Sequence, residues 1–399
     1  MIARADVVIV GAGPAGAATA ILLAEHGLGV TVLDRGPRTR PKICGEYLSP
    51  EAGRVLDRLG VLKTVDAGGA AALAGMRITA PDGTVLDARY GAVAAFRPYR
   101  DHAMGVSRAT LDGALLDRVR ALPVDLREGV RVTDVIVEHG RVVGVRAAEV
   151  TGAVVEVRAS VVIAADGRAS VIAHRLGCRH PHPLARMALV TYVTGVRDCR
   201  DVGEIFVDPP DYAILNPLAP DRINLSLVVP LAHAAAWRAR LEDFFVARIK
   251  QLPHLSRRLA GAARVAPLSS LGPLAYRVVP PREGGVLLVG DAAGFYDPFT
   301  GEGIFTALRS AELAADTVLG ALRAGDVSAV ALGAYERARR AAFADKQRLT
   351  RALQAVIGRR PVANLVAHWL AARPRVLAAL LGVIGDYVPP RALPRLLLS

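Results

Sequence analysis

Residues 7–34 constrain the fold more than any other part of this 399-residue chain. Four apolar residues, 7–10, predict a strand that is buried on both faces. Gly11, Gly13 and Gly16 follow this strand in G-x-G-x-x-G spacing. In that pattern the first glycine makes a tight turn, the second lets a pyrophosphate approach the backbone, and the third lets the helix pack closely on the strand.

A helix is predicted to run from this turn to about His26, where Gly27 ends it, and a second strand to end at Asp34. The N-terminus of the helix offers unpaired N–H groups and a positive dipole end to phosphate groups. Asp34 lies 18 residues beyond Gly16, where a carboxylate accepts hydrogen bonds from a ribose diol. Strand, turn, helix, strand and carboxylate in this order predict a site for an ADP-containing dinucleotide.

The length and the 52% hydrophobic content predict two or three domains with a core that needs no disulfides. The cysteines, Cys44, Cys178 and Cys199, have neither disulfide-framework nor metal-ligand spacing, and the nine histidines show no ligand spacing. No signal-peptide pattern precedes the first strand, and no charge-free apolar run reaches ~18 residues. We therefore expect a cytoplasmic protein with no metal site.

The net charge of +13 is unevenly distributed along the chain. Residues 331–399 hold twelve Lys or Arg and three Asp or Glu, a net charge of +9 in 69 residues. This charge fits either a solvated helical face or a surface that meets anionic lipid or an acidic partner such as a carrier protein. No nucleic-acid recognition motif accompanies it, so a nucleic-acid partner is not expected.

Two later stretches repeat the order of an apolar strand followed at once by aspartate and glycine. Residues 161–165 predict a buried strand that ends at Asp166-Gly167, and residues 286–289 predict one that runs into Gly290-Asp291. Between them, residues 186–230 predict an antiparallel sheet of short strands. Helices are predicted after Ser49, after Ser107, at about 234–251, from about Gly301, and in the C-terminal region around 349–357 and 376–384.

The glycine fingerprint, Asp166-Gly167 and the segment VLLVGDAAGFYDPFTGEGI, in this order, resemble FAD-dependent oxidoreductases of the p-hydroxybenzoate hydroxylase-like superfamily. Within it, Lys42-Ile-Cys44-Gly45-Glu46 followed by LSPEA is similar to the geranylgeranyl reductase family, and the resemblance covers most of residues 1–320. It implies an α/β fold with a Rossmann-type FAD-binding domain, an antiparallel β-sheet substrate domain and a C-terminal helical cap. The expected FAD-binding domain comprises 1–73, 100–180 and 275–330, the substrate domain 74–99 and 181–274, and the helical region 331–399.

The resemblance also assigns residues to the cofactor. A helix that starts near Gly301 would point N–H groups at the flavin N1/C2=O edge, which becomes anionic on reduction. The residues expected to contact FAD are Gly11, Gly13, Pro14, Ala15, Gly16, Asp34, Arg35, Cys44, Arg108, Val132, Asp166, Gly167, Asp291, Pro298, Gly301, Gly303 and Ile304.

Cys44, Glu46 and Tyr212 are the candidate catalytic residues. Cys44 either packs as a small hydrophobe or acts near the flavin, in which case nearby Lys42 would lower its pKa. Glu46 either faces the same cavity or lies on the surface, and Tyr212 either lines the substrate pocket or packs in the core. The segment YAILNP keeps Tyr212 and Pro217 but lacks the large aromatic residues of the Tyr-x-Trp-x-Phe-Pro and Trp-x-Trp-x-Ile-Pro segments, which argues against a halogenase.

The resemblance implies an FAD-dependent oxidoreductase that acts on a lipophilic small molecule. A reductase of C=C bonds is the first expectation, and a monooxygenase of a natural-product or quinone-like substrate is the alternative. A third reading, from another class, is a flavin-bearing protein that docks on a membrane surface or a carrier protein. No second G-x-G-x-x-G is present, so a nicotinamide donor would lack a Rossmann domain of its own. NAD(P)H is expected to bind transiently as the electron donor, with a reduced ferredoxin or free flavin as the alternatives, and the oligomeric state stays open.

Overall fold

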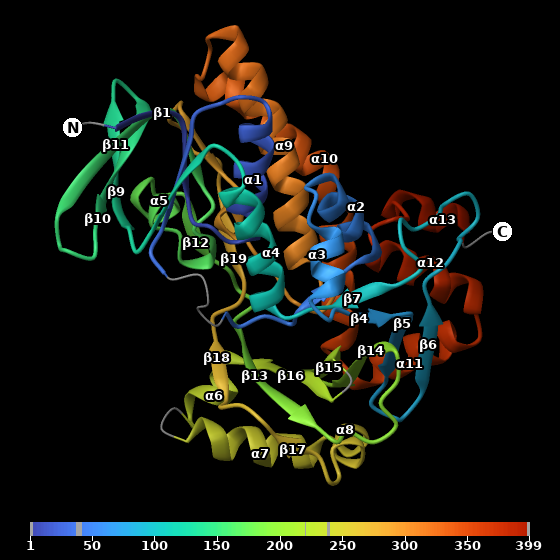
Figure 1. The fold of residues 1–399 in the computed structure, drawn as a ribbon. Helices are drawn as coiled ribbons and strands as arrows, with labels where there is room; N and C mark the ends of the chain where they lie inside the picture. Colours follow the sequence, from blue (N-terminus) through green and yellow to red (C-terminus); the bar gives the residue numbers. More distant parts are fainter. Residues whose placement is uncertain (1–2, 37–41, 220, 238–239, 397–399) are drawn as a thin grey trace.

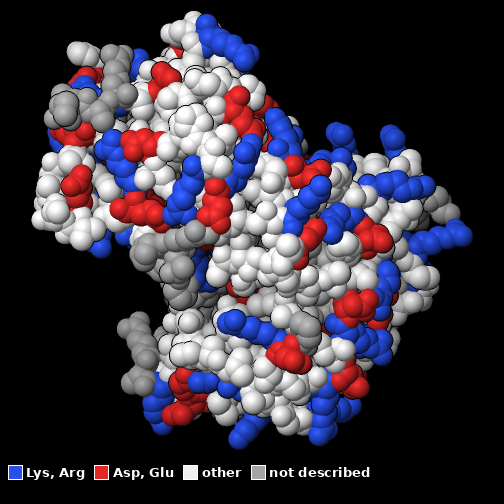
Figure 2. Space-filling model, in the orientation of Figure 1, with Lys and Arg blue, Asp and Glu red and all other residues white. Residues whose placement is uncertain are grey.

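The computed structural model describes residues 3–36, 42–219, 221–237 and 240–396. Two large β-sheets lie one above the other, with helices around the upper sheet and a group of C-terminal helices on the right-hand side (Figure 1). A notch separates the upper and lower parts on the left-hand side of the space-filling view (Figure 2).

The upper sheet contains the glycine fingerprint, and its central strands are parallel. Within the described ranges it has seven strands in the order β8-β2-β1-β11-β10-β9, with β20 paired to the second half of β11. Residues 7–10 are almost fully buried, as expected for a parallel strand covered on both faces. The strands are β1 (Ala3–Val10), β2 (Val30–Asp34), β8 (Val124–Glu128), β9 (Arg131–Glu138), β10 (Arg141–Ala148), β11 (Val154–Ala164) and β20 (Val286–Leu288).

Three long helices pack together against this sheet: α1 (Pro14–Glu25), α4 (Arg108–Arg120) and α9 (Gly303–Ala324). A side chain on Gly16 would overlap the Gly11 carbonyl oxygen, so only glycine lets α1 begin this close to β1. Shorter elements surround them: α2 (Pro50–Arg58), α3 (Leu62–Ala67), α5 (Val171–Arg175), the 3₁₀ turns η1 (Gly167–Ala169) and η2 (Gly290–Ala293), and the paired strands β12 (Arg179–Pro181) and β19 (Tyr276–Val278).

The lower sheet is largely antiparallel, as predicted for its central part. In the described part of the chain it has eight strands in the order β17-β13-β16-β15-β14-β5-β6, with β18 also paired to β13. The strands are β5 (Gly75–Thr79), β6 (Val85–Arg89), β13 (Arg186–Thr194), β14 (Val202–Asp208), β15 (Asp211–Ala219), β16 (Arg222–Pro230), β17 (Ala263–Arg264) and β18 (Ser269–Leu271).

The single helix predicted at about 234–251 is wrong. The structure has α6 (Leu231–Ala235) and then α7 (Leu241–Gln251), followed by α8 (Pro253–Arg258). Two acidic residues, Glu242 and Asp243, lie in the first turn of α7, where they favour the start of a helix. The acidic pair is therefore a start signal that the predicted continuous helix overlooked.

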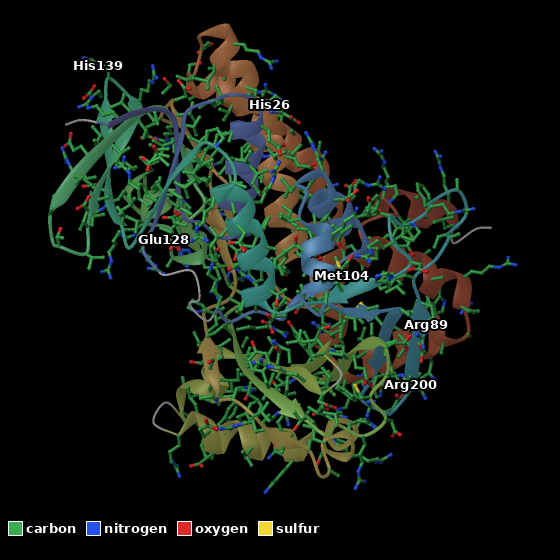
Figure 3. All side chains as sticks on the ribbon, in the orientation of Figure 1. His26, Arg89, Met104, Glu128, His139 and Arg200 are labelled. Atoms are coloured by element: carbon green, nitrogen blue, oxygen red, sulfur yellow. The ribbon has the colours of Figure 1, made fainter. Side chains whose placement is uncertain are left out.

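A small sheet of three strands joins the upper and lower parts. It consists of β3 (Tyr47–Leu48), β7 (Ala103–Gly105) and β4 (Ala71–Leu73). Met104 of β7, which is labelled in Figure 3, lies in this central region and pairs with Leu48. A side chain on Gly105 would overlap the Pro217 carbonyl oxygen of β15, so the two parts meet backbone to backbone here.

The C-terminal region consists of α10 (Ala329–Ile357), α11 (Arg360–Ala371), α12 (Pro374–Ile384), the turn η3 (Pro390–Ala392) and α13 (Leu393–Leu396). One buried face of α10 is polar, because Lys346, Thr350 and Gln354 recur every four residues and are each nearly inaccessible. The inner faces of α11 and α12 share a hydrophobic core with Tyr212 and Phe299. The domain boundaries stay a prediction.

Candidate active site

The glycine turn after β1 lies against the end of β11. Gly11 has a φ of +98°, and a side chain there would come within 2.5 Å of the Ala165 carbonyl oxygen. Among the described residues, no side chain caps the N-terminus of α1, so its first N–H groups are open to an anion there. Within the same residues, a side chain on Gly13 would come within 4 Å of the Lys42 Nζ alone, at 3.9 Å. The turn therefore combines an open backbone, a helix N-terminus and a nearby cation, which suits a pyrophosphate.

Asp34 shapes this turn from the end of β2. Its Oδ2 accepts a hydrogen bond from the Ala12 N–H at 2.7 Å, and its Oδ1 accepts one from Gly36 at 2.8 Å. A carboxylate accepts more than two hydrogen bonds, so a ribose hydroxyl can still bind it. The side chain of Arg35 is exposed, while that of Val132 is buried in the core of the upper sheet, which leaves its backbone for a contact with a ligand.

The two aspartates that follow β11 and β20 have different surroundings. Asp166 Oδ2 accepts a hydrogen bond from the Val171 N–H at 2.7 Å and so caps α5, while its buried Oδ1 has no partner among the described residues. The carboxylate of Asp291 accepts no hydrogen bond that we find in the described part of the chain. Burial raises the pKa of Asp291 from 3.8 to about 6, although Arg168 and Arg108 oppose that shift.

Cys44 lies beside Arg108, where the upper part meets the lower sheet. Its Sγ accepts a hydrogen bond from the Glu46 N–H at 3.3 Å. Burial raises the pKa of the Cys44 thiol, and Arg108 opposes the shift only in part. The prediction that Lys42 lowers this pKa is wrong, because Lys42 Nζ pairs with Asp112 at 2.6 Å. The thiol therefore holds its proton at neutral pH.

Glu46 is 2% exposed, and each oxygen of its carboxylate accepts a hydrogen bond. It accepts hydrogen bonds from the Arg108 N–H at 2.8 Å and from Asn224 Nδ2 at 3.0 Å, and it also bonds the Tyr192 hydroxyl. Its φ of +56° is a strained conformation for a residue with a side chain. These contacts assign Glu46 to positioning of the Cys44 segment rather than to contact with a substrate.

Two asparagines of the lower sheet hold the same segment, and neither was predicted as a site residue. Asn216 Nδ2 donates to the Gly45 and Glu46 carbonyl oxygens at 2.9 and 3.0 Å, and Asn224 Nδ2 donates to the Cys44 carbonyl oxygen at 2.8 Å. Both side chains are almost fully buried. Asn216 replaces an aromatic residue of the expected segment, and that replacement was the available signal for its role.

The loop of residues 297–302 lies on the other side of the site and leads into α9. Asp297 Oδ1 accepts hydrogen bonds from the Phe299 N–H at 2.9 Å and from Gln354 Nε2 of α10 at 2.7 Å. Glu302 Oε1 accepts one from Thr350, one turn earlier on α10, at 2.8 Å. The polar face of α10 therefore fixes both ends of this loop.

Gly301 of this loop has a φ of +67°, and a side chain there would meet the Tyr47 ring at 2.5 Å. The loop thus contacts the residue that follows Glu46. Of the other expected contacts in this region, Pro298 and Gly303 are partly buried, and Ile304 is buried in the core beneath α9.

Tyr212 is placed in the core. Its side chain is 0% exposed, and its hydroxyl donates to Asp297 Oδ1 at 2.6 Å. Its ring meets Phe299 edge to face, with the ring centroids 5.2 Å apart. The expectation that Tyr212 lines a pocket is therefore corrected: the residue supports the 297–302 loop from the lower sheet.

These observations fit FAD. The open backbone at Gly13 and the uncapped helix α1 suit its pyrophosphate, and Asp34 its ribose. Among the described residues the Asp291 carboxylate accepts no hydrogen bond, which suits the hydroxyl groups of a ribityl chain. Gly301 lies against Tyr47, so the 297–302 loop contacts the residue that follows the Cys44 segment. Within the described residues, no group of three His, Cys, Asp or Glu side chains could hold a metal ion.

Comparisons with known proteins support FAD as the cofactor. Residues 4–350 match the FAD binding domain family. The chain is 28% identical to digeranylgeranylglycerophospholipid reductase of Methanosphaerula palustris, covering 83% of this chain and 80% of that one. It is 25% identical to 1H-pyrrole-2-carbonyl-[peptidyl-carrier protein] chlorinase of Pseudomonas fluorescens, covering 83% and 79%.

Among solved structures, the flavin-dependent brominase Bmp2 superposes with a TM-score of 0.85 at 22% identity, over 99% of this chain and 98% of that one. This likeness, together with the family match, confirms the predicted α/β fold with its Rossmann-type part, antiparallel sheet and C-terminal helices.

Proposed function

The chain belongs to the FAD binding domain family and is an FAD-dependent enzyme, and from this premise we propose that it reduces C=C bonds of a lipophilic small molecule. The observation that carries the proposal is the Cys44 thiol. It keeps its proton at neutral pH and lies on a segment that three buried side chains, Glu46, Asn216 and Asn224, hold in place. Reduction of a C=C bond needs such a proton donor beside a source of hydride.

When bound and reduced, FAD supplies the hydride equivalent. Cys44 holds at Sγ the proton that the second carbon of the double bond takes up. Arg108, the nearby cation, stabilises the thiolate that remains after the proton leaves. The Glu46 N–H, at 3.3 Å from Sγ, adds a hydrogen bond that is stronger to the thiolate than to the thiol.

The substrate we propose is a molecule with isolated C=C bonds in a hydrocarbon chain, the class that the name of the Methanosphaerula palustris relative indicates for that protein. NAD(P)H is the proposed electron donor, by transient binding, since the chain carries one dinucleotide fingerprint. We further propose a cytoplasmic location, and an anionic partner for the basic region 331–399.

A single-turnover experiment without oxygen tests the proposed reaction. The purified yellow protein is reduced with dithionite under argon and mixed with a lipid that carries a geranylgeranyl chain, and the product is analysed by mass spectrometry. We expect each enzyme-bound flavin to add two hydrogen atoms to one double bond. A strict requirement for oxygen would refute the reductase, and consumption of NADH or NADPH, followed separately, tests the electron donor.

One observation favours the alternative, a monooxygenase of a more polar natural product. Three buried polar atoms near Tyr212 have no hydrogen-bond partner among the described residues: Asp297 Oδ2, Gln354 Oε1 and Arg186 Nη1. The Arg186 guanidinium carbon lies 5.5 Å from the centre of the Tyr212 ring. These atoms lie in the core around Tyr212, so a polar substrate would reach them only if the 297–302 loop moved. Product that forms only in air, with one added oxygen atom, would support this function.

A further inference from the structure

The charge of the C-terminal region is concentrated in one stretch. Residues 346–385 contain no Asp or Glu and seven cations, at Lys346, Arg348, Arg351, Arg359, Arg360, Arg373 and Arg375. Within the described residues, three of these cations pair with acidic groups outside the stretch: Lys346 with Asp386, Arg348 with Asp345, and Arg360 with Asp208. For the three that flank α11, namely Arg359, Arg373 and Arg375, we find no ion pair in this part of the chain.

Helix α11 carries apolar residues on its outer side as well as on its inner face, although the exposed His368 beside them pairs with Asp82. The inner residues Ala363, Ala367 and Leu370 are buried in the core. On the outer face, Leu365 is 70% exposed and Trp369, one turn later, is 42% exposed. Pro361 and Ala372, also exposed, extend the same stripe at both ends. We call these four outer residues the α11 stripe.

The α11 stripe ends at a positively charged turn. The guanidinium of Arg373 lies over the Trp369 ring, with its central carbon 4.6 Å from the ring centre. Arg375 follows in the first turn of α12 and is exposed. An apolar stripe with tryptophan at one end and arginines at both ends is the pattern of a helix that lies in the headgroup region of a bilayer.

The shape of this region favours contact with a bilayer rather than insertion across it. Among the described residues, no single helix is both long enough and apolar enough to span a membrane. Helices α11 and α12 pass that test only as a pair, and the chain bends by 111° between them. Both helices lie at the lower right of the molecule (Figure 1), and Lys and Arg side chains project from the right-hand edge in the region of α12 and α13 (Figure 2).

We propose that the α11 stripe, with Arg359, Arg373 and Arg375 around it, is a binding surface for an anionic phospholipid membrane. Leu365 and Trp369 would enter the region below the headgroups, and the arginines would lie at the level of the phosphates. Charge complementarity alone would also fit an acidic protein. The exposed apolar stripe favours lipid, because it offers a helix-length apolar contact with few hydrogen-bonding groups.

The inner face of α11 shares a hydrophobic core with residues that support the candidate active site. Ala363, Ala367 and Leu370 belong to the same core as Tyr212 and Phe299, which support the 297–302 loop. The α11 stripe and the side chains that support the 297–302 loop therefore border one continuous hydrophobic core. The inference itself does not depend on which reaction the flavin site performs.

Flotation with lipid vesicles tests the proposal on the full-length, FAD-containing protein. One set of vesicles contains phosphatidylcholine alone, and the other contains equal parts of phosphatidylcholine and phosphatidylglycerol. We expect binding to the anionic set at low salt. Both Leu365→Ser/Trp369→Ser and Arg373→Glu/Arg375→Glu should weaken that binding by at least ~10-fold, because each removes one of the two attractions.

Matched controls change residues of the same kind elsewhere on the surface. Val150→Ser/Val154→Ser alters two exposed apolar residues beside β10 and β11, and Arg131→Glu/Arg323→Glu reverses two exposed charges. Both controls should bind vesicles like the parent. All variants should keep their FAD, since none of the changed residues belongs to the flavin site.

The fluorescence of Trp369 gives a second readout. The chain has two tryptophans, so Trp237→Phe leaves Trp369 as the single reporter. Its emission should shift to shorter wavelength with anionic vesicles and be quenched by brominated lipid. The proposal is overturned if the protein ignores anionic vesicles, if the stripe variants bind them like the parent, or if the stripe instead mediates a dimer or binds an acidic carrier protein in preference to lipid.

Discussion

Replacing Gly301 with alanine should weaken FAD binding, and the two ends of helix α9 provide the comparison. Gly301 precedes α9 with a φ of +67°, and Gly325 ends the same helix with a φ of +68°. A new methyl group at Gly301 would meet the Tyr47 ring at 2.5 Å, whereas at Gly325 nothing lies within 4 Å. The two substitutions therefore carry the same backbone strain, and Gly301→Ala alone adds a steric overlap.

The left-handed conformation costs an alanine about 1–2 kcal/mol at either position. The overlap cannot be relieved cheaply, because Tyr47 is buried and its hydroxyl is bonded to that of Tyr90. Overpacking of this kind costs about 1–3 kcal/mol. The loop can relieve the overlap by moving away from Tyr47, but FAD binding must then return it to its place at the same cost. A loss of about 1–3 kcal/mol of binding free energy corresponds to an increase in Kd of about 5- to 150-fold.

Flavin fluorescence during titration of the flavin-free protein measures the Kd of each variant. Gly325→Ala should bind FAD like the parent while melting slightly earlier, and Gly301→Ala should bind it more weakly. Equal Kd values for the two variants would refute the reasoning, because the 297–302 loop would then not be coupled to the cofactor through Tyr47.

Three further predictions concern the site. Cys44→Ser should keep its yellow FAD but react about 10²- to 10⁴-fold more slowly in a single turnover under argon, which is the usual contribution of one general acid. An unchanged rate would show that Cys44 serves only in packing. Burial raises the pKa of Asp291 to about 6, so the folded state favours the protonated carboxyl. The stability that the protonated Asp291 contributes is complete below about pH 4 and is lost as the pH rises through 6. In the flavin-free protein, Asp291→Asn should therefore gain up to about 3 kcal/mol over the parent at pH 8 and nothing at pH 4, as measured by urea unfolding; a constant difference contradicts this. Asn224→Leu removes the donor of two buried acceptors and should cost about 1–3 kcal/mol for each, with faster alkylation of Cys44 by iodoacetamide in peptide maps. Asn364→Leu, at a half-buried site that accepts one hydrogen bond, should cost less and leave the alkylation rate unchanged.

Much of the fold follows from local sequence because the central strands of a covered parallel sheet must be continuously apolar. This requirement identifies β1 and β20 and the second half of β11, together with the Asp-Gly and Gly-Asp residues that end two of them. The glycine fingerprint predicts the close approach of α1 to β1, because a side chain at Gly16 would overlap the Gly11 carbonyl oxygen. The break between α6 and α7 was missed although its signal, an acidic first turn, is local.

The polar side chains that hold the site could not be predicted, because their partners are distant in sequence. Asn224 bonds a carbonyl 180 residues away, and Gln354 bonds a carboxylate 57 residues away. A pattern of apolar residues in α10 cannot show that its buried face carries Lys346, Thr350 and Gln354. The core position of Tyr212 was missed because its hydrogen-bond partner, Asp297, is also distant in the sequence.

The asparagine bonds between the lower sheet and the Cys44 segment add to the small three-stranded sheet and the Tyr212–Asp297 bond that also link the two parts of the molecule. Asn216 and Asn224 belong to strands β15 and β16, and the acceptors belong to a segment that precedes β3. If the lower sheet tilts, these hydrogen bonds would therefore move the Cys44 segment, and with it the thiol, in the same direction.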